Sequence, residues 1–171
     1  MKIDKSRIKE IIKGNENLRI AVVVSNFNKS VTDKLLKGAL LALKKNKIKD
    51  KNIEIYRVPG SFEIPVVTAN LCRVYEVDRC FDGIITLGCI IKGETAHFEY
   101  IAESASNTLS LLSTKQNIPI GFGILTCYTK QQASDRCKIN PINSDGNKGY
   151  ECALSVLETI RVLKRIKNFN F

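Results

Sequence analysis

The chain has 171 residues, of which 44% are hydrophobic and 26% charged, with a net charge of +10 and no Trp. This length and composition favour one folded domain with its own core and exclude a disordered or collagen-like chain. No apolar run approaches the ~18 residues of a membrane span and no secretory signal is recognisable at the N-terminus, so we expect no membrane partner.

Residues 1–17 form a polar arm ahead of an expected single α/β domain at residues 18–171. The apolar run "LRIAVVVSNFN" predicts a strand ending in a polar turn, and "SVTDKLLKGALLALKKN" has helical spacing of its leucines. The next strand, in "NIEIYRVPGSFEIP", must end near Val58, because Pro59 has no N–H for a sheet. "IPVVTANLCRVYEV" then predicts a helix with Pro65 in its first turn.

The second half continues this alternation with a strand in "FDGIITLGCII", a helix at residues 100–115 and a strand in "IPIGFGILTC". A short helix at residues 130–137, the irregular segment "KINPINSDGN" and a long last helix follow. The strands are near-continuous apolar runs, as expected when both faces of a sheet are covered. The pattern predicts a three-layer αβα sandwich around a four-stranded parallel sheet, which is a flavodoxin-like fold.

The cysteines show no CxxC pair and no zinc-ligand spacing, so we expect no metal site. They are Cys72, Cys80, Cys89, Cys127, Cys137 and Cys152. Several lie in apolar runs, where a free Cys acts as a small hydrophobe, which predicts reduced thiols and a cytoplasmic location. The basic residues are scattered and lack aromatic interleaving, so we expect a solvated surface and no nucleic-acid partner.

Unusual residues follow each predicted strand, at the edge of a parallel sheet where ligands bind. Phe27 lies in a turn, where its ring either folds onto the core or stacks on a planar heterocycle. Ser61, Phe62 and Glu63 open a helix whose unpaired backbone donors attract polar ligand atoms. Glu63 is read either as a ligand contact or as a charge that complements the helix dipole.

The third strand leads into Gly93, Glu94 and Thr95, which form either a nest of amides for a phosphate or a capping loop with Thr95 as the cap. His97 is the only histidine, and it either transfers protons or is structural. Arg136 is a candidate phosphate clamp or an ordinary surface residue. Lys148 opposes the dipole of the last helix, which indicates an anion or an electron-rich ligand nearby.

Taken in order, "SNFN", "VPGSFEIP", "LGCIIKGETAHFEY", "PIGFGILT", "QQASDR" and "GNKGYE" resemble the 6,7-dimethyl-8-ribityllumazine synthase family over about residues 18–165. The resemblance implies condensation of 5-amino-6-(D-ribitylamino)uracil with 3,4-dihydroxy-2-butanone 4-phosphate, with release of phosphate and water. It implies two small-molecule substrates and no metal or organic cofactor. A non-catalytic flavodoxin-like flavin-binding protein is the alternative, although "SNFNKSVTD" matches its phosphate loop poorly.

The resemblance also assigns roles to residues. His97 would transfer protons, and Phe27 would stack on the pyrimidine. The other predicted contacts to the pyrimidine and its ribityl chain are Ser61, Phe62, Glu63, Cys89, Ile90, Ile91, Phe122 and Lys148. Glu94, Thr95 and Arg136 would bind the phosphate. Phe122 and Arg136 would come from a neighbouring subunit, so the resemblance predicts self-association and an inactive monomer.

The chain departs from the family pattern in three places. Cys89 replaces a more common Thr or Ala, and Lys92 stands where Arg is frequent, which keeps the charge without the planar fork. The segment "CKINPINSD" at residues 137–145 is longer than the linker of capsid-forming members. A longer linker would crowd contacts between pentamers, so we expect a pentamer, with a shell of sixty subunits as the alternative.

Overall fold

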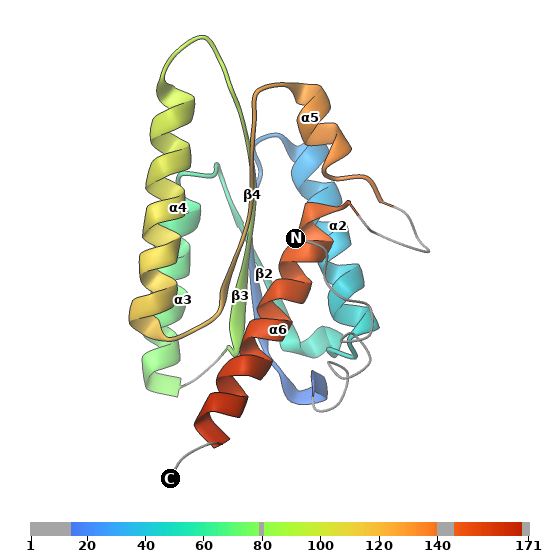
Figure 1. The fold of residues 1–171 in the computed structure, drawn as a ribbon, viewed down its shortest axis with the longest axis vertical. Coiled ribbons are helices and arrows are strands. Elements are labelled where there is room, and N and C mark those ends of the chain that lie inside the picture. Colours follow the sequence, from blue (N-terminus) through green and yellow to red (C-terminus); the bar gives the residue numbers. More distant parts are fainter. Residues whose placement is uncertain (1–14, 79–80, 140–145, 169–171) are drawn as a thin grey trace.

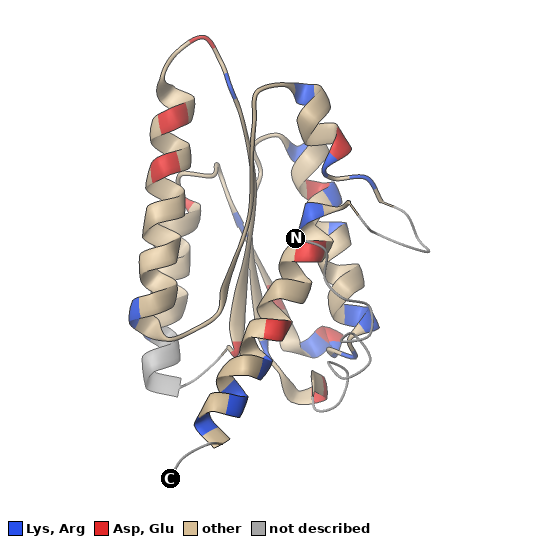
Figure 2. Ribbon diagram, viewed as in Figure 1, with Lys and Arg blue, Asp and Glu red and all other residues tan. Residues whose placement is uncertain are grey.

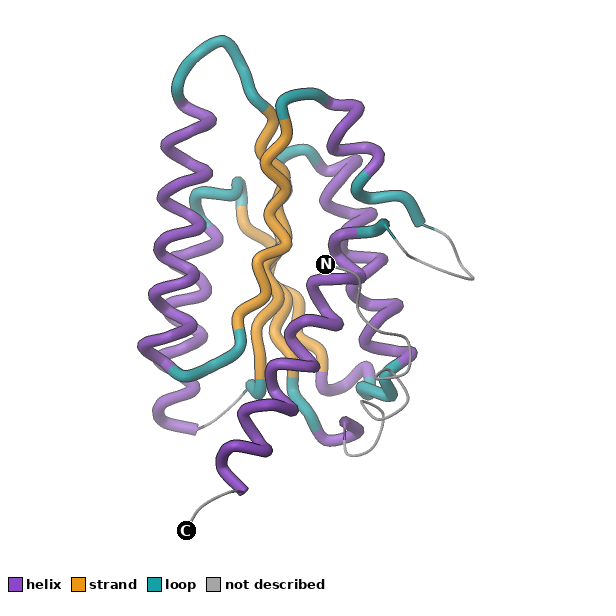
Figure 3. The backbone as a smooth tube through the Cα atoms, in the orientation of Figure 1, coloured by secondary structure: helices purple, strands orange, loops and turns teal. Residues whose placement is uncertain are grey.

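The computed structural model describes residues 15–78, 81–139 and 146–168. Its strands are β1 (Ile20–Ser25), β2 (Ile53–Val58), β3 (Gly83–Ile91) and β4 (Ile120–Cys127). They form one parallel sheet of four strands in the order β2-β1-β3-β4. Figure 3 shows the strands in orange between two layers of helices. The predicted flavodoxin-like α/β fold is therefore confirmed.

Helices cover both faces of this sheet and make the three layers of Figure 1. One outer layer holds α3 (Ile64–Asp78) and α4 (His97–Gln116). The other holds α2 (Lys29–Lys45), the short α5 (Lys130–Asp135) and α6 (Lys148–Asn168). Two 3-10 turns, η1 (Asn15–Asn17) and η2 (Asp50–Asn52), precede β1 and β2.

The central strands divide their side chains between two cores, because successive residues of a strand point to opposite faces. On β1, Val22 packs towards α2 and α6, whereas Val23 packs towards α3 and α4. Both β1 and β3 are buried along nearly their whole length. This explains why their sequences are continuous apolar runs.

The edge strand β2 does not fit the expectation that both faces are covered. Glu54, Ile55 and Arg57 are exposed, and Ile55 retains 44% of its accessible surface. An edge strand has a neighbour on one side only, and charged side chains there oppose pairing with other chains. The alternation of Ile with Glu and Arg in "IEIYRV" is the sequence pattern of this half-covered strand.

Two predicted helix boundaries differ from those observed. The fourth helix begins at His97 rather than at residue 100, and α5 ends at Asp135 rather than at residue 137. The predicted arm lies outside the described residues except for Asn15–Asn17, and so do residues 140–145 of the long linker. Within the described ranges, no helix combines the length and apolar character that a bilayer crossing requires.

Charge is unevenly distributed between the two helical layers (Figure 2). Lys and Arg are concentrated on α2 and α6, whereas the described part of α3 and α4 carries few charges. Because all strands are parallel, their carboxyl ends and the loops that follow them gather at one edge of the sheet. Ligands of open α/β folds bind at this edge, called the rim below.

Candidate active site

A pocket of about 570 Å³ lies at the rim, and all but one of the residues predicted for the first three strand ends line it. Those residues are Phe27, Ser61, Phe62, Glu63, Cys89, Ile90, Ile91, Thr95 and His97. The exception is Glu94, which is exposed on the loop between the lining residues Gly93 and Thr95. No Lys or Arg is among the described residues that line this first pocket.

Phe27 lies on the loop between β1 and α2 and keeps 68% of its surface exposed. The structure therefore excludes a ring folded onto the core. The loop is held by backbone bonds to the neighbouring loop, in which Asn26 N–H donates to Val58 O at 2.8 Å and Phe27 N–H donates to Pro59 O at 3.0 Å. An aromatic ring held open in this way can cover a planar ligand.

Ser61 presents a hydroxyl that lacks a partner. The residue is only 7% exposed, and its Oγ has no hydrogen-bond partner among the described residues. Gly88 lies directly beneath it, since a Cβ at this glycine would come within 2.6 Å of that Oγ. Buried hydroxyls are normally paired, so this Oγ is suited to a polar ligand atom in the pocket.

Glu63 accepts a hydrogen bond from the N–H of Gly60 at 2.8 Å through Oε2. The carboxylate therefore closes the turn between β2 and α3. This partner is local, and it orients the carboxylate at the start of α3, where a negative charge is also favoured by the helix dipole. Glu63 lines the pocket in this orientation, and its contact with a ligand stays a prediction.

The loop from β3 to α4 leaves several backbone donors free. Lys92 N–H donates to Cys127 O at 2.9 Å. The next backbone N–H along the chain with a described acceptor is that of Glu99, in the first turn of α4, which donates to Ala96 O at 3.1 Å. The helix N-cap is Ala96, with no side-chain cap bond, so the capping role considered for Thr95 is wrong. Free amides at the start of a helix suit an anion.

An ion pair fixes the same loop from outside. Lys92 Nζ lies 2.7 Å from Glu99 Oε1, and the ammonium also lies 5.7 Å from the centre of the Tyr128 ring. Their mutual hydrogen bond lowers the pKa of Glu99 and raises that of Lys92. His97 lies on the intervening turn, exposed and lining the pocket, so it is not a buried structural histidine.

The peptide edge of β3 is open at the pocket. The N–H groups of Ile84 and Lys92 both donate to carbonyls on the β4 side, at 2.9 Å. Because peptide groups alternate along a strand, those of odd-numbered residues point towards β1. Pairing with β1 extends only to Leu87, so Ile91 presents its N–H and C=O beyond the end of that strand.

A second pocket of about 340 Å³ lies beside β4 and shares no lining residue with the first. It contains the three remaining predicted residues, Phe122, Arg136 and Lys148. Phe122 is 45% exposed on the edge strand. Lys148 pairs with Glu151 at 2.6 Å, so the anionic group that its position indicated is supplied, in this structure, by its own helix.

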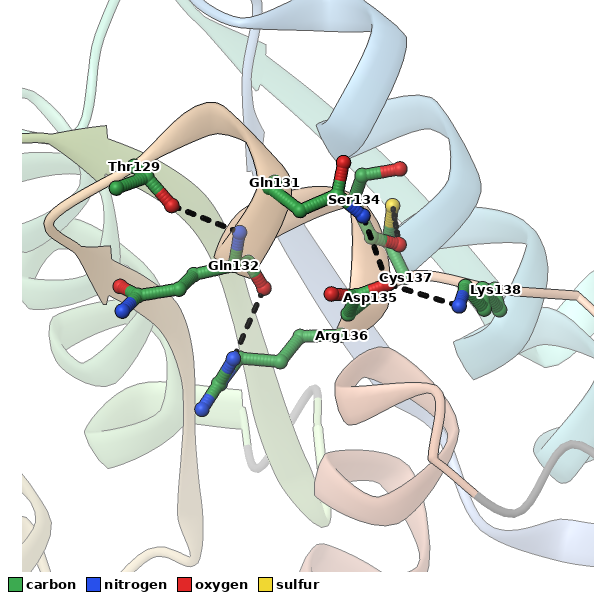
Figure 4. A network of polar contacts seen from close by, with 8 residues as sticks. All are labelled: Thr129, Gln131, Gln132, Ser134, Asp135, Arg136, Cys137 and Lys138. Atoms are coloured by element: carbon green, nitrogen blue, oxygen red, sulfur yellow. Dashed lines mark hydrogen bonds and ion pairs between the residues drawn. The ribbon is translucent and has the colours of Figure 1, made fainter.

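The arginine of this second pocket is the C-cap of α5, and Figure 4 shows its surroundings. Thr129 caps the helix by accepting from Gln132 N–H at 3.1 Å, and Arg136 Nη1 donates to the carbonyl of Gln132 at 3.0 Å. Asp135 makes its ion pair with Lys138, at 2.8 Å, and the nearby Arg136 guanidinium also helps to lower the pKa of this carboxyl. Most donors of Arg136 remain available for an anion.

Asn147, which was not predicted as a site residue, fixes Arg136 and Lys148 relative to each other. It is fully buried, and its Nδ2 donates to the carbonyls of Cys137 at 3.0 Å and Lys34 at 3.2 Å. Its Oδ1 accepts from Tyr150 N–H at 3.1 Å, which caps α6. Other lining residues that were not predicted are Gly60, Phe98, Tyr100 and Ile101 in the first pocket and Gly123, Ile124, Leu125, Thr126, Glu151, Cys152 and Ser155 in the second.

The five described cysteines are free, as expected, and all are buried. Cys89 contributes its backbone to the pocket, while its side chain packs on the opposite face of the sheet with the α2 and α6 core. Burial raises its pKa to about 12, so this thiol is no nucleophile at neutral pH. The substitution of Cys for Thr or Ala at this position therefore leaves the pocket wall unchanged.

The order of these features along the chain is that of a known enzyme family. A family model described as 6,7-dimethyl-8-ribityllumazine synthase matches residues 17–164. The chain belongs to this family. The resemblance derived from the sequence motifs is thereby confirmed.

Curated relatives agree with the family model. The 6,7-dimethyl-8-ribityllumazine synthase of Kosmotoga olearia is 40% identical over 152 residues, which cover 89% of this chain and 92% of the relative. The enzyme of the same name from Blochmanniella pennsylvanica is 45% identical over 151 residues, which cover 88% and 90%. Both matches therefore extend over most of the chain.

Proposed function

We propose that this chain condenses 5-amino-6-(D-ribitylamino)uracil with 3,4-dihydroxy-2-butanone 4-phosphate to give 6,7-dimethyl-8-ribityllumazine, the penultimate step of riboflavin synthesis. The observation that carries the proposal is the first pocket, where an exposed ring, an unpaired hydroxyl and the only imidazole surround one cavity. The amine of the uracil attacks the ketone to form an imine with release of one water, phosphate then leaves, and ring closure releases a second water.

The pyrimidine substrate fits the part of the pocket beside β3. Phe27 stacks on the heterocycle, and the open peptide edge of Ile91 meets its alternating donors and acceptors. Ser61 and Glu63 supply a hydroxyl and a carboxylate for the ribityl hydroxyl groups, and Phe62 and Ile90 form the apolar wall. Placing both reactants in one orientation supplies much of the rate, because intramolecular geometry replaces a bimolecular encounter.

His97 transfers protons during imine formation and phosphate departure. It lies one turn from the free amides of the loop between β3 and α4, to which the phosphate binds through Glu94 and Thr95. The two ring nitrogens of an imidazole can accept and donate a proton, so the side chain serves in both directions of proton transfer. Its place between the pyrimidine and phosphate regions supports this role.

The site is completed by a second subunit. A substrate phosphate carries negative charge, yet the first pocket has no cation among its lining residues, whereas Arg136 and Lys148 line the separate second pocket. Docking the β4 edge of one protomer against the first pocket of another would bring the missing cations and Phe122 to the substrates. Exposed Val66 and Leu111, on the charge-poor layer of α3 and α4, support packing between subunits.

We propose a pentamer as the assembly, with the long linker preventing further association. Five copies of the 19.1 kDa chain make a particle of about 96 kDa, and sixty copies one of about 1,150 kDa. Light scattering separates these masses without ambiguity. A particle near the larger mass would contradict the pentamer while leaving the proposed chemistry intact. The buried free thiols support a reducing, cytoplasmic location.

The reaction is tested by mixing the purified protein with both substrates and following the absorbance and green fluorescence of the lumazine. Release of inorganic phosphate, measured in parallel, must match the lumazine formed. Omission of either substrate is the control, since the uncatalysed condensation sets the background rate. A protein that binds flavin tightly and gives no rate above this background would instead be the non-catalytic flavin-binding alternative.

A further inference from the structure

Asn28 adopts an unusual conformation beside the first pocket. It is the N-cap of α2, with φ 55° and ψ 44° in the left-handed region, and its side chain makes no cap bond. An Asn at this position usually accepts a hydrogen bond from the first turn of its helix. Here Nδ2 donates instead to the carbonyl of Cys89 at 2.9 Å, away from the helix.

The acceptor of this bond is significant because of where β1 ends. Pairing between β1 and β3 ends with Val24 and Leu87. The carbonyl of Cys89 points towards the β1 side of β3, as that of Leu87 does, but it lies beyond this last residue pair. The amide of Asn28 takes the place of the next strand residue. It leaves Ile91 as the first peptide group on this side that is open to a ligand.

The adjacent Phe27 is therefore attached to both walls of the pocket. Its N–H bonds Pro59 O at 3.0 Å on the β2 side, and its carbonyl accepts from Ser25 Oγ at 3.3 Å. Within the described residues, Asn28 makes the one side-chain hydrogen bond that joins this loop to β3. Without it, the loop would remain tied to β2 and free to shift relative to the peptide edge of β3.

We propose that Asn28 is a positioning residue that sets the distance between the Phe27 ring and the open peptide edge of β3. The inference rests on the proposed function, because the pyrimidine is the ligand that uses both. A residue in this role acts on binding of the pyrimidine and not on the phosphorylated ketone, whose contacts lie on the loop between β3 and α4.

The test compares two variants with a matched control. Asn28→Asp keeps the size and the tolerance of a left-handed backbone but replaces the donor by an acceptor. Asn28→Gly keeps the backbone conformation and removes the side chain. Asn117→Gly is the control, because Asn117 is also left-handed, with φ 52°, and caps the far end of α4.

Both Asn28 variants are expected to raise the KM of the pyrimidine about 3- to 10-fold, the loss expected for one hydrogen bond. The Kd of the fluorescent lumazine product, measured by direct titration, rises in parallel. The KM of the phosphorylated ketone and kcat change less than about twofold. Asn117→Gly matches wild type in all four quantities, and thermal unfolding establishes that each variant is folded.

A pyrimidine KM and lumazine Kd equal to wild type would overturn the inference, as would a parallel rise in both KM values. A merely structural role for Asn28 would lower the folded fraction, and therefore the apparent kcat, with the KM values unchanged. The two proposals fail differently, since a wild-type protein without turnover refutes the function. The Kd for lumazine would then still report on Asn28 directly.

Discussion

The backbone N–H of Lys148 donates to the carbonyl oxygen of Arg136 at 2.8 Å. This bond joins the first residue of α6 to the C-cap of α5, so two cations from different helices reach one pocket. Asn147 reinforces the junction through its bonds to Cys137 and Lys34. These hydrogen bonds hold Arg136 and Lys148 side by side in the lining of the second pocket.

Arg136→Ala should raise the KM of the phosphorylated ketone by about 10- to 100-fold, the loss expected for hydrogen bonds to a charged group. The KM of the pyrimidine should change far less. Steady-state kinetics with each substrate varied in turn measure both effects. Lys138→Ala is the matched control, because it removes the same charge from the same segment but does not line the pocket.

His97→Ala should lower kcat by about 100-fold, at the small end of the range for general acid–base catalysis. Some activity should remain, because the uncatalysed condensation also occurs and the pocket still orients both substrates. Size-exclusion chromatography should give the wild-type assembly, since the exposed imidazole makes no contact in the core. An unchanged kcat would remove His97 from the mechanism.

Gly149→Ala should destabilise the protein by about 1–3 kcal/mol, the usual range for overpacking. A Cβ at this position would lie 2.0 Å from the carbonyl oxygen of Leu35, where α6 crosses α2. Gly93→Ala is the comparison, since nothing lies within 4 Å of its Cβ position. Urea unfolding monitored by circular dichroism compares the two, and equal midpoints would contradict the close helix packing.

Stability should fall at alkaline pH because of a buried thiol. Burial raises the pKa of Cys152 to about 12, whereas an unfolded thiol titrates near ~8.5. Between these values the Cys152 thiol keeps its proton in the folded chain and has lost it in the unfolded chain. This one group therefore lowers the free energy of unfolding by about 1.4 kcal/mol per pH unit. Below both values this contribution is constant.

Denaturant unfolding at neutral pH and at about one unit above the unfolded thiol pKa measures this slope. Cys152→Ala should make the decrease in unfolding free energy smaller than in wild type, although Cys89 still contributes. If both proteins show the same slope over this interval, Cys152 is not the titrating group.

Much of the fold could be predicted because burial leaves a clear pattern. The continuous apolar runs of β1 and β3 and the helical spacing in α2 and α6 specify a covered sheet. The start of α4 was misplaced because its first residues, from His97, follow a loop without a capping side chain. The exposure of β2 depends on the strand order, which the local sequence does not contain.

Most pocket-lining residues at the first three strand ends could be predicted from the sequence, whereas the division between two pockets was implied by family resemblance alone. Strand order places β4 at an edge, which separates Phe122 and Arg136 from the first pocket. Asn28 and Asn147 were missed because their partners are distant in sequence. Asn28 bonds a carbonyl 61 positions away, and one partner of Asn147 lies 113 positions away.

We propose that each active site combines the first pocket of one subunit with the second pocket of its neighbour. Co-assembly of His97→Ala and Arg136→Ala chains, carried on different affinity tags, tests it most directly. In mixed assemblies purified through both tags, random pairing restores intact sites at about a quarter of the interfaces, because the two defects fall on different chains. At ketone concentrations well below the wild-type KM, where both variants are impaired, activity near a quarter of wild type is therefore predicted, and activity no higher than the mean of the two variants alone would contradict the shared site.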